Sequence, residues 1–261
     1  MDLGLTGKTA LVLGASRGLG AAIARGLLAE GATVHAAARN IERIEAWRGS
    51  LPADWAVRLV PVHTDLAAPG AADKLAVMAL ARGQIDILVN NGGGPPASPV
   101  SAVTAEQWIG QFQAMAATIF ELTRLLLPAM IERRWGRIIT IASSGVEQPI
   151  PNLALSNAIR SAVVGWSKTL ASEVAGHGVT VNILVPGRIH TDRVNELDQA
   201  AAIAQNKTTQ QIASASVAVI PVGRYGTPEE FADAVAFVAS TRASYITGAK
   251  IRVDGGLIRS V

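Results

Sequence analysis

The chain has 261 residues, 49% of them hydrophobic, which is enough to bury one large core in a single domain spanning residues 1–261. The net charge is only +3, the basic residues are scattered and aromatic residues make up 4%, a composition that argues against a nucleic-acid-binding protein. The absence of cysteine excludes disulfides and thiolate metal sites, and we expect a cytoplasmic protein without a bound metal.

Short β-branched runs alternate with longer helical patterns along the chain. Seven strands are predicted at residues 9–13, 32–36, 57–62, 85–89, 137–141, 180–185 and 250–253. Helices are predicted at residues 17–29, 68–81, 105–134, 153–175 and 228–239. Several strands are apolar without interruption, so both of their faces should be covered, as in a parallel sheet with helices on each side. The pattern therefore predicts a doubly wound α/β fold.

Three segments bear on targeting, on membranes and on mobility. The first eight residues lack a basic segment followed by an apolar stretch, so no targeting segment is expected. The apolar run at 119–131 contains Glu121 and Arg124, and we expect it to be too short and too charged to span a bilayer. Residues 200–219 are rich in alanine and serine with few apolar anchors, and we interpret them as a mobile substrate lid.

A glycine-rich turn follows the first predicted strand and opens the first predicted helix. Glycines there permit tight backbone geometry and let a pyrophosphate approach the helix N-terminus, whose free N–H groups favour an anion. The position between strand and helix predicts a dinucleotide-binding turn, the alternative being a merely tight connection. Its expected binding residues are Gly14, Ser16, Arg17, Gly18, Leu19 and Gly20.

The second predicted strand indicates which dinucleotide is bound. An acidic residue about twenty positions after the glycines would accept the ribose 2′-hydroxyl of NAD, whereas an arginine would pair with the 2′-phosphate of NADP. Residues 31–40 contain no aspartate or glutamate, and the strand is followed by Arg39. Arg39 and Arg17 together can clamp a phosphate. We therefore favour NADP(H) over NAD(H), with Arg39 as a solvated surface charge as the alternative.

Three polar residues stand where catalysis is expected. Ser143 closely follows the fifth predicted strand, and Ser156 and Arg160 lie 13 and 17 residues later, at the start of a long helix. With the glycine turn, this spacing resembles the Ser…Tyr-x-x-x-Lys signature of the short-chain dehydrogenases/reductases, with serine in place of tyrosine and arginine in place of lysine. The resemblance runs from end to end of the chain. Residues 152–157 look like an atypical subgroup of the 3-oxoacyl-[acyl-carrier-protein] reductases with a degenerate catalytic tetrad.

The resemblance implies a Rossmann-type sheet of order 3-2-1-4-5-6-7 and a homotetramer formed through the helices at 105–134 and 153–175. Ala162, Val163 and Trp166 are candidate contacts, although their spacing would equally suit an internal core face. It implies that Ser143 polarises a carbonyl, that Ser156 stands where the proton-donating tyrosine would be, and that Arg160 stands where the ribose-binding lysine would be. Met115 falls at the position of the fourth member, an asparagine.

Further cofactor contacts also follow from the resemblance. Asp65 and Leu66 would meet the adenine, although Asp65 could equally be a helix N-cap. Asn91 and Gly92 would border the cofactor, whereas the neighbouring Asn90 could be structural. The loop after the sixth strand would hold the nicotinamide amide through Pro186, Gly187, Ile189 and Thr191.

Two functions are compatible with these residues, and a third possibility is an α/β domain that binds no nucleotide. The first is an NADP(H)-dependent reductase of a small-molecule carbonyl or acyl thioester substrate. The second is a catalytically silent relative that binds NADP(H) and acts as a sensor or assembly subunit. A serine at 156 is a far weaker acid than a phenol, so another donor is needed for the first, and His190 in the nicotinamide loop is a candidate because histidine exchanges protons near neutral pH.

Overall fold

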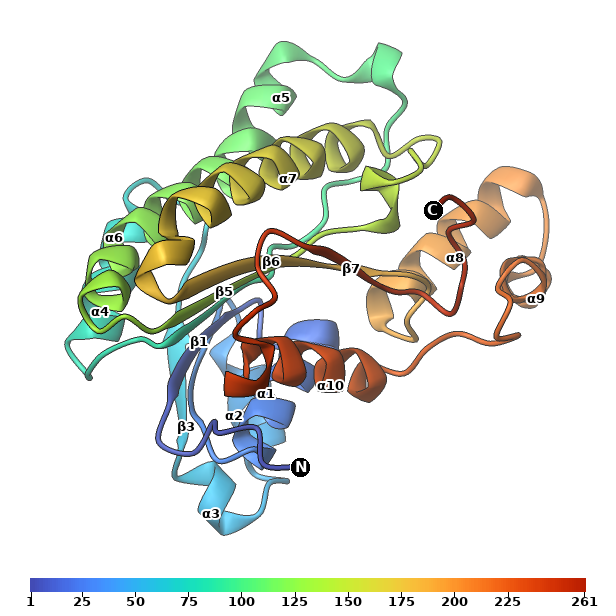
Figure 1. Ribbon diagram of the computed structural model, residues 1–261. Helices are drawn as coiled ribbons and strands as arrows, with labels where there is room; N and C mark the ends of the chain where they lie inside the picture. Colours follow the sequence, from blue (N-terminus) through green and yellow to red (C-terminus); the bar gives the residue numbers. More distant parts are fainter.

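The computed structural model describes residues 1–261 and contains one sheet of seven parallel strands in the order β3-β2-β1-β4-β5-β6-β7 (Figure 1). The strands are β1 Thr9–Leu13, β2 Thr33–Ala38, β3 Leu59–His63, β4 Ile87–Asn90, β5 Gly136–Ile141, β6 Val179–Pro186 and β7 Lys250–Val253. The predicted fold class and strand order are confirmed.

Ten α-helices connect and flank these strands. They are α1 Gly18–Ala29, α2 Ile41–Arg48, α3 Ala53–Ala56, α4 Ala71–Leu80, α5 Ala105–Phe112, α6 Thr118–Glu132, α7 Ala154–Val174, α8 Asp192–Gln205, α9 Thr209–Ala218 and α10 Pro228–Ala239. The short turns are η1 Val100–Ala102, η2 Gln113–Ala117, η3 Ser144–Val146, η4 Ala175–His177 and η5 Thr241–Ala243, of which η2 is a π-turn that joins α5 to α6. All five predicted helices are present, whereas α2, α3, α8 and α9 were not predicted.

Alternation along the strands divides the core between the two faces of the sheet. In β1, Ala10 and Val12 pack with α1 and α10, whereas Leu11 and Leu13 pack with α4, α6 and α7. The helices accordingly form two layers, with α1, α2 and α10 below the sheet in Figure 1 and α4, α6 and α7 above it. Strands β4 and β5 in the middle of the sheet are buried throughout, as the uninterrupted apolar runs predicted, whereas the edge strands β3 and β7 are partly exposed.

Helices α5 and α6 form one long helical segment with the turn η2 between them. Ala105–Glu132 forms 28 helical residues with a mean hydropathy of 1.5 in its most apolar window, which is long and apolar enough to cross a membrane. The apolar run at 119–131 is thus one part of a longer helical segment. Within the fold, 44% of that window is buried, and Leu122, Leu126 and Met130 belong to the core beneath α4. Packing inside the protein accounts for this apolarity.

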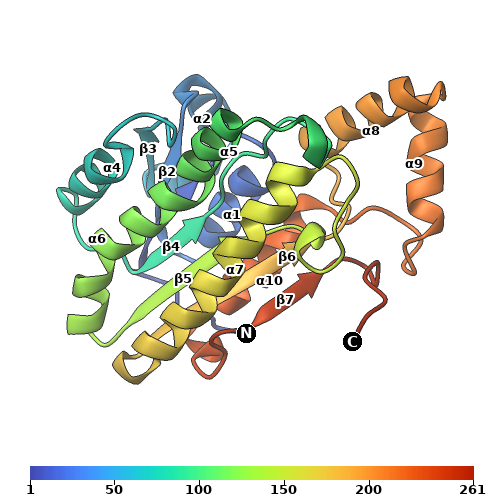
Figure 2. The same ribbon diagram turned by 90° about the horizontal axis from the view of Figure 1, so that it is seen from above.

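A helical hairpin of α8 and α9 projects beyond the carboxyl ends of β6 and β7 (Figures 1 and 2). It contains nearly all of residues 200–219, which we interpreted as a mobile substrate lid. Asn206 ends α8 in the left-handed conformation, and a capping box between Thr208 and Gln211 starts α9. Only Ile212 of α9 is buried, so few apolar contacts hold this helix.

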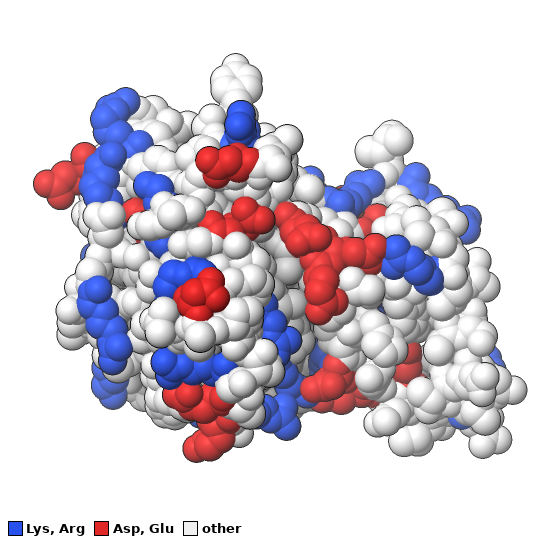
Figure 3. All heavy atoms as spheres, turned by 90° about the horizontal axis from the view of Figure 1, so that it is seen from below, with Lys and Arg blue, Asp and Glu red and all other residues white.

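Charges on the face opposite to that of Figure 2 are mixed. Figure 3 shows lysine and arginine interspersed with aspartate and glutamate there, apart from a short band of acidic side chains near the middle of the view. The scattered charges of the sequence are thus also scattered in space on this face.

Candidate active site

The glycine turn between β1 and α1 is packed so closely that two of its positions admit only glycine. A Cβ on Gly20 would lie 2.2 Å from the carbonyl oxygen of Gly14, and a Cβ on Gly14 would lie 2.5 Å from that of Asn91. The Asn91 amide donates to the carbonyl oxygen of Leu13 at 3.2 Å, so the predicted residue Asn91 does border the turn. No side chain caps the N-terminus of α1 and no acid occupies its first turn. Its N–H groups are therefore available to an anion.

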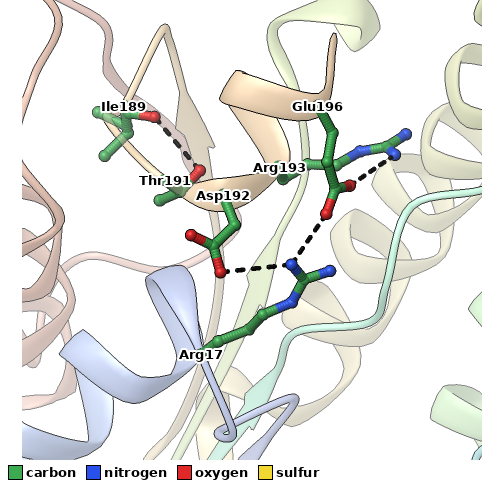
Figure 4. A network of polar contacts seen from close by, with 6 residues as sticks. All are labelled: Arg17, Ile189, Thr191, Asp192, Arg193 and Glu196. Carbon is green, nitrogen blue, oxygen red and sulfur yellow. Dashed lines mark hydrogen bonds and ion pairs between the residues drawn. The ribbon is translucent and has the colours of Figure 1, made fainter. Parts of the chain in front are cut away.

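Arg17 leaves this turn and reaches across to α8 (Figure 4). Its Nη1 lies 2.9 Å from Glu196 Oε1 and 3.4 Å from Asp192 Oδ2. Glu196 also lies 3.6 Å from Arg193, and the Arg17 hydrogen bond holds the pKa of Glu196 below its ordinary value. Arg39 is exposed after the end of β2 and forms no ion pair. Of the arginine pair predicted to clamp a phosphate, Arg17 is thus engaged by carboxylates and only Arg39 is unpaired.

The loop between β6 and α8 lies beside the glycine turn. The Thr191 hydroxyl donates to the carbonyl oxygen of Ile189 at 3.3 Å (Figure 4), and the Thr191 methyl group would lie 3.7 Å from a Cβ on Gly18. A Cβ on Gly187 would collide with Asp254 at 2.6 Å, so this glycine lets the loop pass the chain after β7. The structure therefore brings the predicted nicotinamide loop and the predicted phosphate turn together.

The segment after β3 shows whether Asp65 is a helix N-cap. Asp65 accepts a hydrogen bond from the N–H of Ala67 at 3.1 Å, whereas α4 begins at Ala71 after Gly70. The interpretation of Asp65 as a helix N-cap is therefore wrong. The carbonyl oxygen of Leu66 accepts from the Thr118 hydroxyl at 2.9 Å, which ties this segment to α6.

Ser143 follows β5 and starts the turn η3. Its Oγ accepts a hydrogen bond from the N–H of Gly145 at 3.1 Å, which leaves the serine proton free to be donated elsewhere. The following loop is fixed by Asn157 on α7, whose amide nitrogen donates to the carbonyl oxygen of Ile150 at 2.8 Å. Sequence reasoning missed Asn157 as a positioning residue; its place one residue after Ser156 was the only signal.

Arg160 is turned toward the ends of two strands. Its Nη1 donates to the carbonyl oxygen of Ile141 at 2.7 Å, and its Nη2 lies 3.5 Å from that of Gly92. Burial, and secondarily the positive charge of Arg193, lowers the pKa of Arg160 to about 10, so the guanidinium stays protonated at neutral pH. Arg160 thus joins the chain after β4 to the end of β5, with the buried Ser156 one helical turn before it.

A small cavity adjoins Arg160. It has about 10 Å³ of space, close to what a single water requires, and its lining includes Asn90, Met115 and Arg160. Asn90 is fully buried and donates toward the Thr140 hydroxyl at 3.4 Å, but its Oδ1 has no partner. A buried acceptor without a partner is costly, so this oxygen suits a bound water.

The two tyrosines of the chain and the candidate proton donor His190 lie in other surroundings. Tyr225 donates its hydroxyl proton to the buried Asp198 at 2.8 Å, and burial raises the pKa of Tyr225. Tyr245 is fully exposed. His190 is exposed and lines a groove beside α1 rather than the cavity at Arg160.

Known proteins resemble this chain over nearly its whole length. The family model described as enoyl-(acyl carrier protein) reductase matches residues 14–258. The 3-oxoacyl-[acyl-carrier-protein] reductase FabG of Escherichia coli is 37% identical over 255 residues, which cover 96% of this chain and 97% of that protein.

Solved structures agree with this similarity. L-sorbose reductase from Gluconobacter frateurii, in complex with NADPH and L-sorbose, is 32% identical, covers 100% of both chains and has a TM-score of 0.93. An actinorhodin polyketide ketoreductase with NADPH is also 32% identical, with a TM-score of 0.89 over 96% of this chain and 97% of that one.

Proposed function

The chain belongs to the short-chain dehydrogenase/reductase family, and from that premise we propose that it is an NADP(H)-dependent oxidoreductase that reduces a carbonyl substrate, a 3-oxoacyl thioester or a similar ketone. The observation that most strongly supports this proposal is the hydrogen bonding of the Ser143 hydroxyl. Its Oγ already accepts the Gly145 N–H, so its own proton can be donated to a carbonyl oxygen.

The chain's residues fit a dinucleotide. The Gly14–Gly20 turn lets a pyrophosphate approach the N-terminus of α1, because side chains at both glycines would collide with backbone. Asp65, Leu66, Asn91, Gly92 and the loop from Pro186 to Thr191 would complete the site around adenine and nicotinamide. When bound, the reduced nicotinamide supplies the hydride, and the protein binds, orients and polarises.

Ser143 and Arg160 have different roles in this proposal. Ser143 donates a hydrogen bond to the carbonyl oxygen as negative charge develops there. Arg160 holds the backbone after β4 and at the end of β5, and so positions Gly92 and Ser143 relative to each other. Ser156 is too weak an acid to replace a phenol, so the proton comes from solvent or from a water at the Asn90 cavity.

We also propose a homotetramer in the cytoplasm, formed through α5, α6 and α7. Ile109 and Phe112 on α5 are large exposed apolar side chains. Trp166 on α7 is partly buried and stacks on Phe120 with ring centroids 4.4 Å apart. Val163 is buried inside the chain against Met115, so the expectation that it contacts a partner is wrong.

NADPH oxidation with a panel of 3-oxoacyl thioesters and diketones tests the function. We expect turnover, and we expect Ser143→Ala to lower kcat about 100-fold or more, because a donor to a developing oxyanion contributes on that scale. Ser144→Ala is the matched control and should retain kcat within about twofold. Tight NADPH binding without oxidation by any carbonyl in the panel would instead favour the silent cofactor-binding relative.

A further inference from the structure

A buried carboxylate lies at the base of the α8–α9 hairpin. Asp198 of α8 is only 2% exposed. Its Oδ1 accepts a hydrogen bond from Nη1 of Arg188, and its Oδ2 accepts one from the Tyr225 hydroxyl at 2.8 Å. Asp198 and Ala202 are the buried residues of α8. This helix is therefore anchored at Asp198 by a polar contact, because it has no apolar stripe to pack.

The two partners of Asp198 come from segments that are paired with each other. Arg188 belongs to the loop between β6 and α8, and Tyr225 belongs to the chain before α10. The N–H of Gly226 donates to the carbonyl oxygen of Arg188 at 2.9 Å, and the N–H of His190 donates to that of Gly226 at 2.8 Å. Asp198 thus joins α8 to two segments that backbone hydrogen bonds already hold together.

This joined unit contains the loop that we expect at the nicotinamide. Ile189 lies between the two backbone hydrogen bonds and is 4% exposed. A Cβ on Gly226 would lie 2.7 Å from Ile189 Cδ1, so the loop and the chain before α10 are in close contact. The carboxylate of Asp198 donates nothing and accepts from this unit alone, whereas neither of its contacts leads to the glycine turn between β1 and α1.

The opposite face of α8 is held by a different contact. Glu196, two residues before Asp198, pairs with Arg17 of the glycine turn. Residues two positions apart are about 200° apart around a helix, so these two acids point in nearly opposite directions. The pair of Glu196 is exposed and contributes little. The buried pair of Asp198 determines the orientation more strongly, because loss of one partner leaves the other charge without compensation.

We propose that Asp198 is a positioning residue for the nicotinamide end of the dinucleotide, which holds Arg188 and Tyr225 and thereby fixes the loop at Ile189 and Thr191. This inference rests on the proposed function, because it concerns the loop that would hold the nicotinamide. Asp198 acts through Arg188 and Tyr225 and does not itself touch the cofactor. The adenosine end of the site, at the glycine turn, does not depend on it.

Calorimetric binding to the full chain tests the proposal without turnover. NADPH contains the nicotinamide, whereas adenosine 2′,5′-bisphosphate contains only the adenosine end of the same dinucleotide. We expect Asp198→Asn to raise Kd for NADPH about 10-fold or more and to change Kd for the bisphosphate less than twofold. A role limited to overall folding would weaken the binding of both ligands alike.

Two milder variants keep the test valid if Asp198→Asn fails to fold. Tyr225→Phe removes only the hydroxyl donor and should raise Kd for NADPH about 2- to 5-fold. Arg188→Lys keeps a cation beside Asp198 and should retain most of the NADPH affinity that Arg188→Gln loses. Neither should change Kd for the bisphosphate more than twofold.

Glu230→Gln is the matched control. It removes an exposed ion pair with Arg224, the neighbour of Tyr225, while glutamine can still accept from Thr227 in the capping box. It should change neither Kd. The proposal is overturned if Asp198→Asn and Tyr225→Phe leave Kd for NADPH within twofold of the wild type, or if they weaken both ligands equally; the proposed function then stands. Failure of the wild-type chain to bind either ligand would overturn both.

Discussion

Replacing Arg160 with methionine removes the guanidinium from two strand ends but keeps an unbranched apolar stem of similar reach. In the structure Nη1 donates to Ile141 at 2.7 Å, while the contact of Nη2 with Gly92 at 3.5 Å lies at the limit for a hydrogen bond. Hydrogen bonds to a charged group contribute about 1.5–3 kcal/mol each. Only the 2.7 Å hydrogen bond contributes this full amount. Removing a partly buried charge is itself favourable, and this offsets part of the stability that is lost with the hydrogen bond.

The expected net loss for Arg160→Met is therefore about 2 kcal/mol, which for a domain of this size lowers Tm by roughly 4–8 °C. Differential scanning calorimetry measures this directly. Arg160→Lys restores a single donor and should recover part of the loss. Arg124→Gln, which removes an exposed arginine from α6, is the surface control and should leave Tm within about 1 °C.

The result separates a backbone tether from a ribose ligand. A tether lowers Tm of the free protein, whereas a ribose ligand weakens cofactor binding and leaves the free protein unchanged. If Arg160→Met kept Tm within about 1 °C while Kd for NADPH rose tenfold or more, the tether would be refuted and the role implied by the family resemblance would hold.

Three further perturbations follow from the same geometry. Gly20→Ala should abolish detectable NADPH binding and lower Tm by at least about 5 °C, because its Cβ would lie 2.2 Å from a backbone oxygen. In the control Gly110→Ala the Cβ has open space around it, so NADPH binding should persist and Tm should not fall. Glu147 has a pKa held below its ordinary value, first by the hydrogen bond from Lys250 and then by Arg252. Its stabilisation is complete above the ordinary glutamate pKa of about 4.3 and is lost as pH falls through the lower folded pKa. Glu147→Gln should therefore flatten the fall of Tm between about pH 5 and pH 3. An unchanged dependence of Tm on pH in this range would contradict the prediction. Glu196→Gln should lower Tm by less than about 3 °C, because exposed ion pairs contribute about 0–1 kcal/mol. It should nevertheless increase the rate of limited proteolysis within α8 and α9. Equal cleavage rates in the variant and the wild type would show that the ion pair with Arg17 does not hold α8 in place.

The strands and the glycine turn were predictable because their signals are local. Each strand is a short apolar run, and the β1–α1 turn carries its glycines at fixed spacing within a few residues. Helix α2 was missed because only Ile44 and Trp47 of its eight residues are buried, which leaves no apolar stripe to detect. Helix α8 was missed for the same reason, because it buries only Asp198 and Ala202.

The contacts of the site were less predictable than its residues. Ser143, Ser156 and Arg160 were identified from spacing, but the direction of the Arg160 side chain depends on carbonyl groups of β5 and of the chain after β4. Arg17 and Glu196 are 179 residues apart, and no local pattern announces their ion pair. A pairing of this kind appears only after the sheet has brought the β1–α1 turn beside α8.

The substitution of serine for a phenol at position 156 restricts which carbonyl compounds this site can reduce. Ser143 can still stabilise the developing oxyanion, an interaction of about 2.7–4 kcal/mol in comparable sites. General-acid transfer, which contributes about 10²–10⁴-fold, is lost unless water provides it. Ketones with a neighbouring thioester or second carbonyl form the least basic alkoxides, so they depend least on a proton donor in the transition state. The roles proposed for Ser143 and Ser156 therefore predict faster reduction of activated ketones than of simple ones.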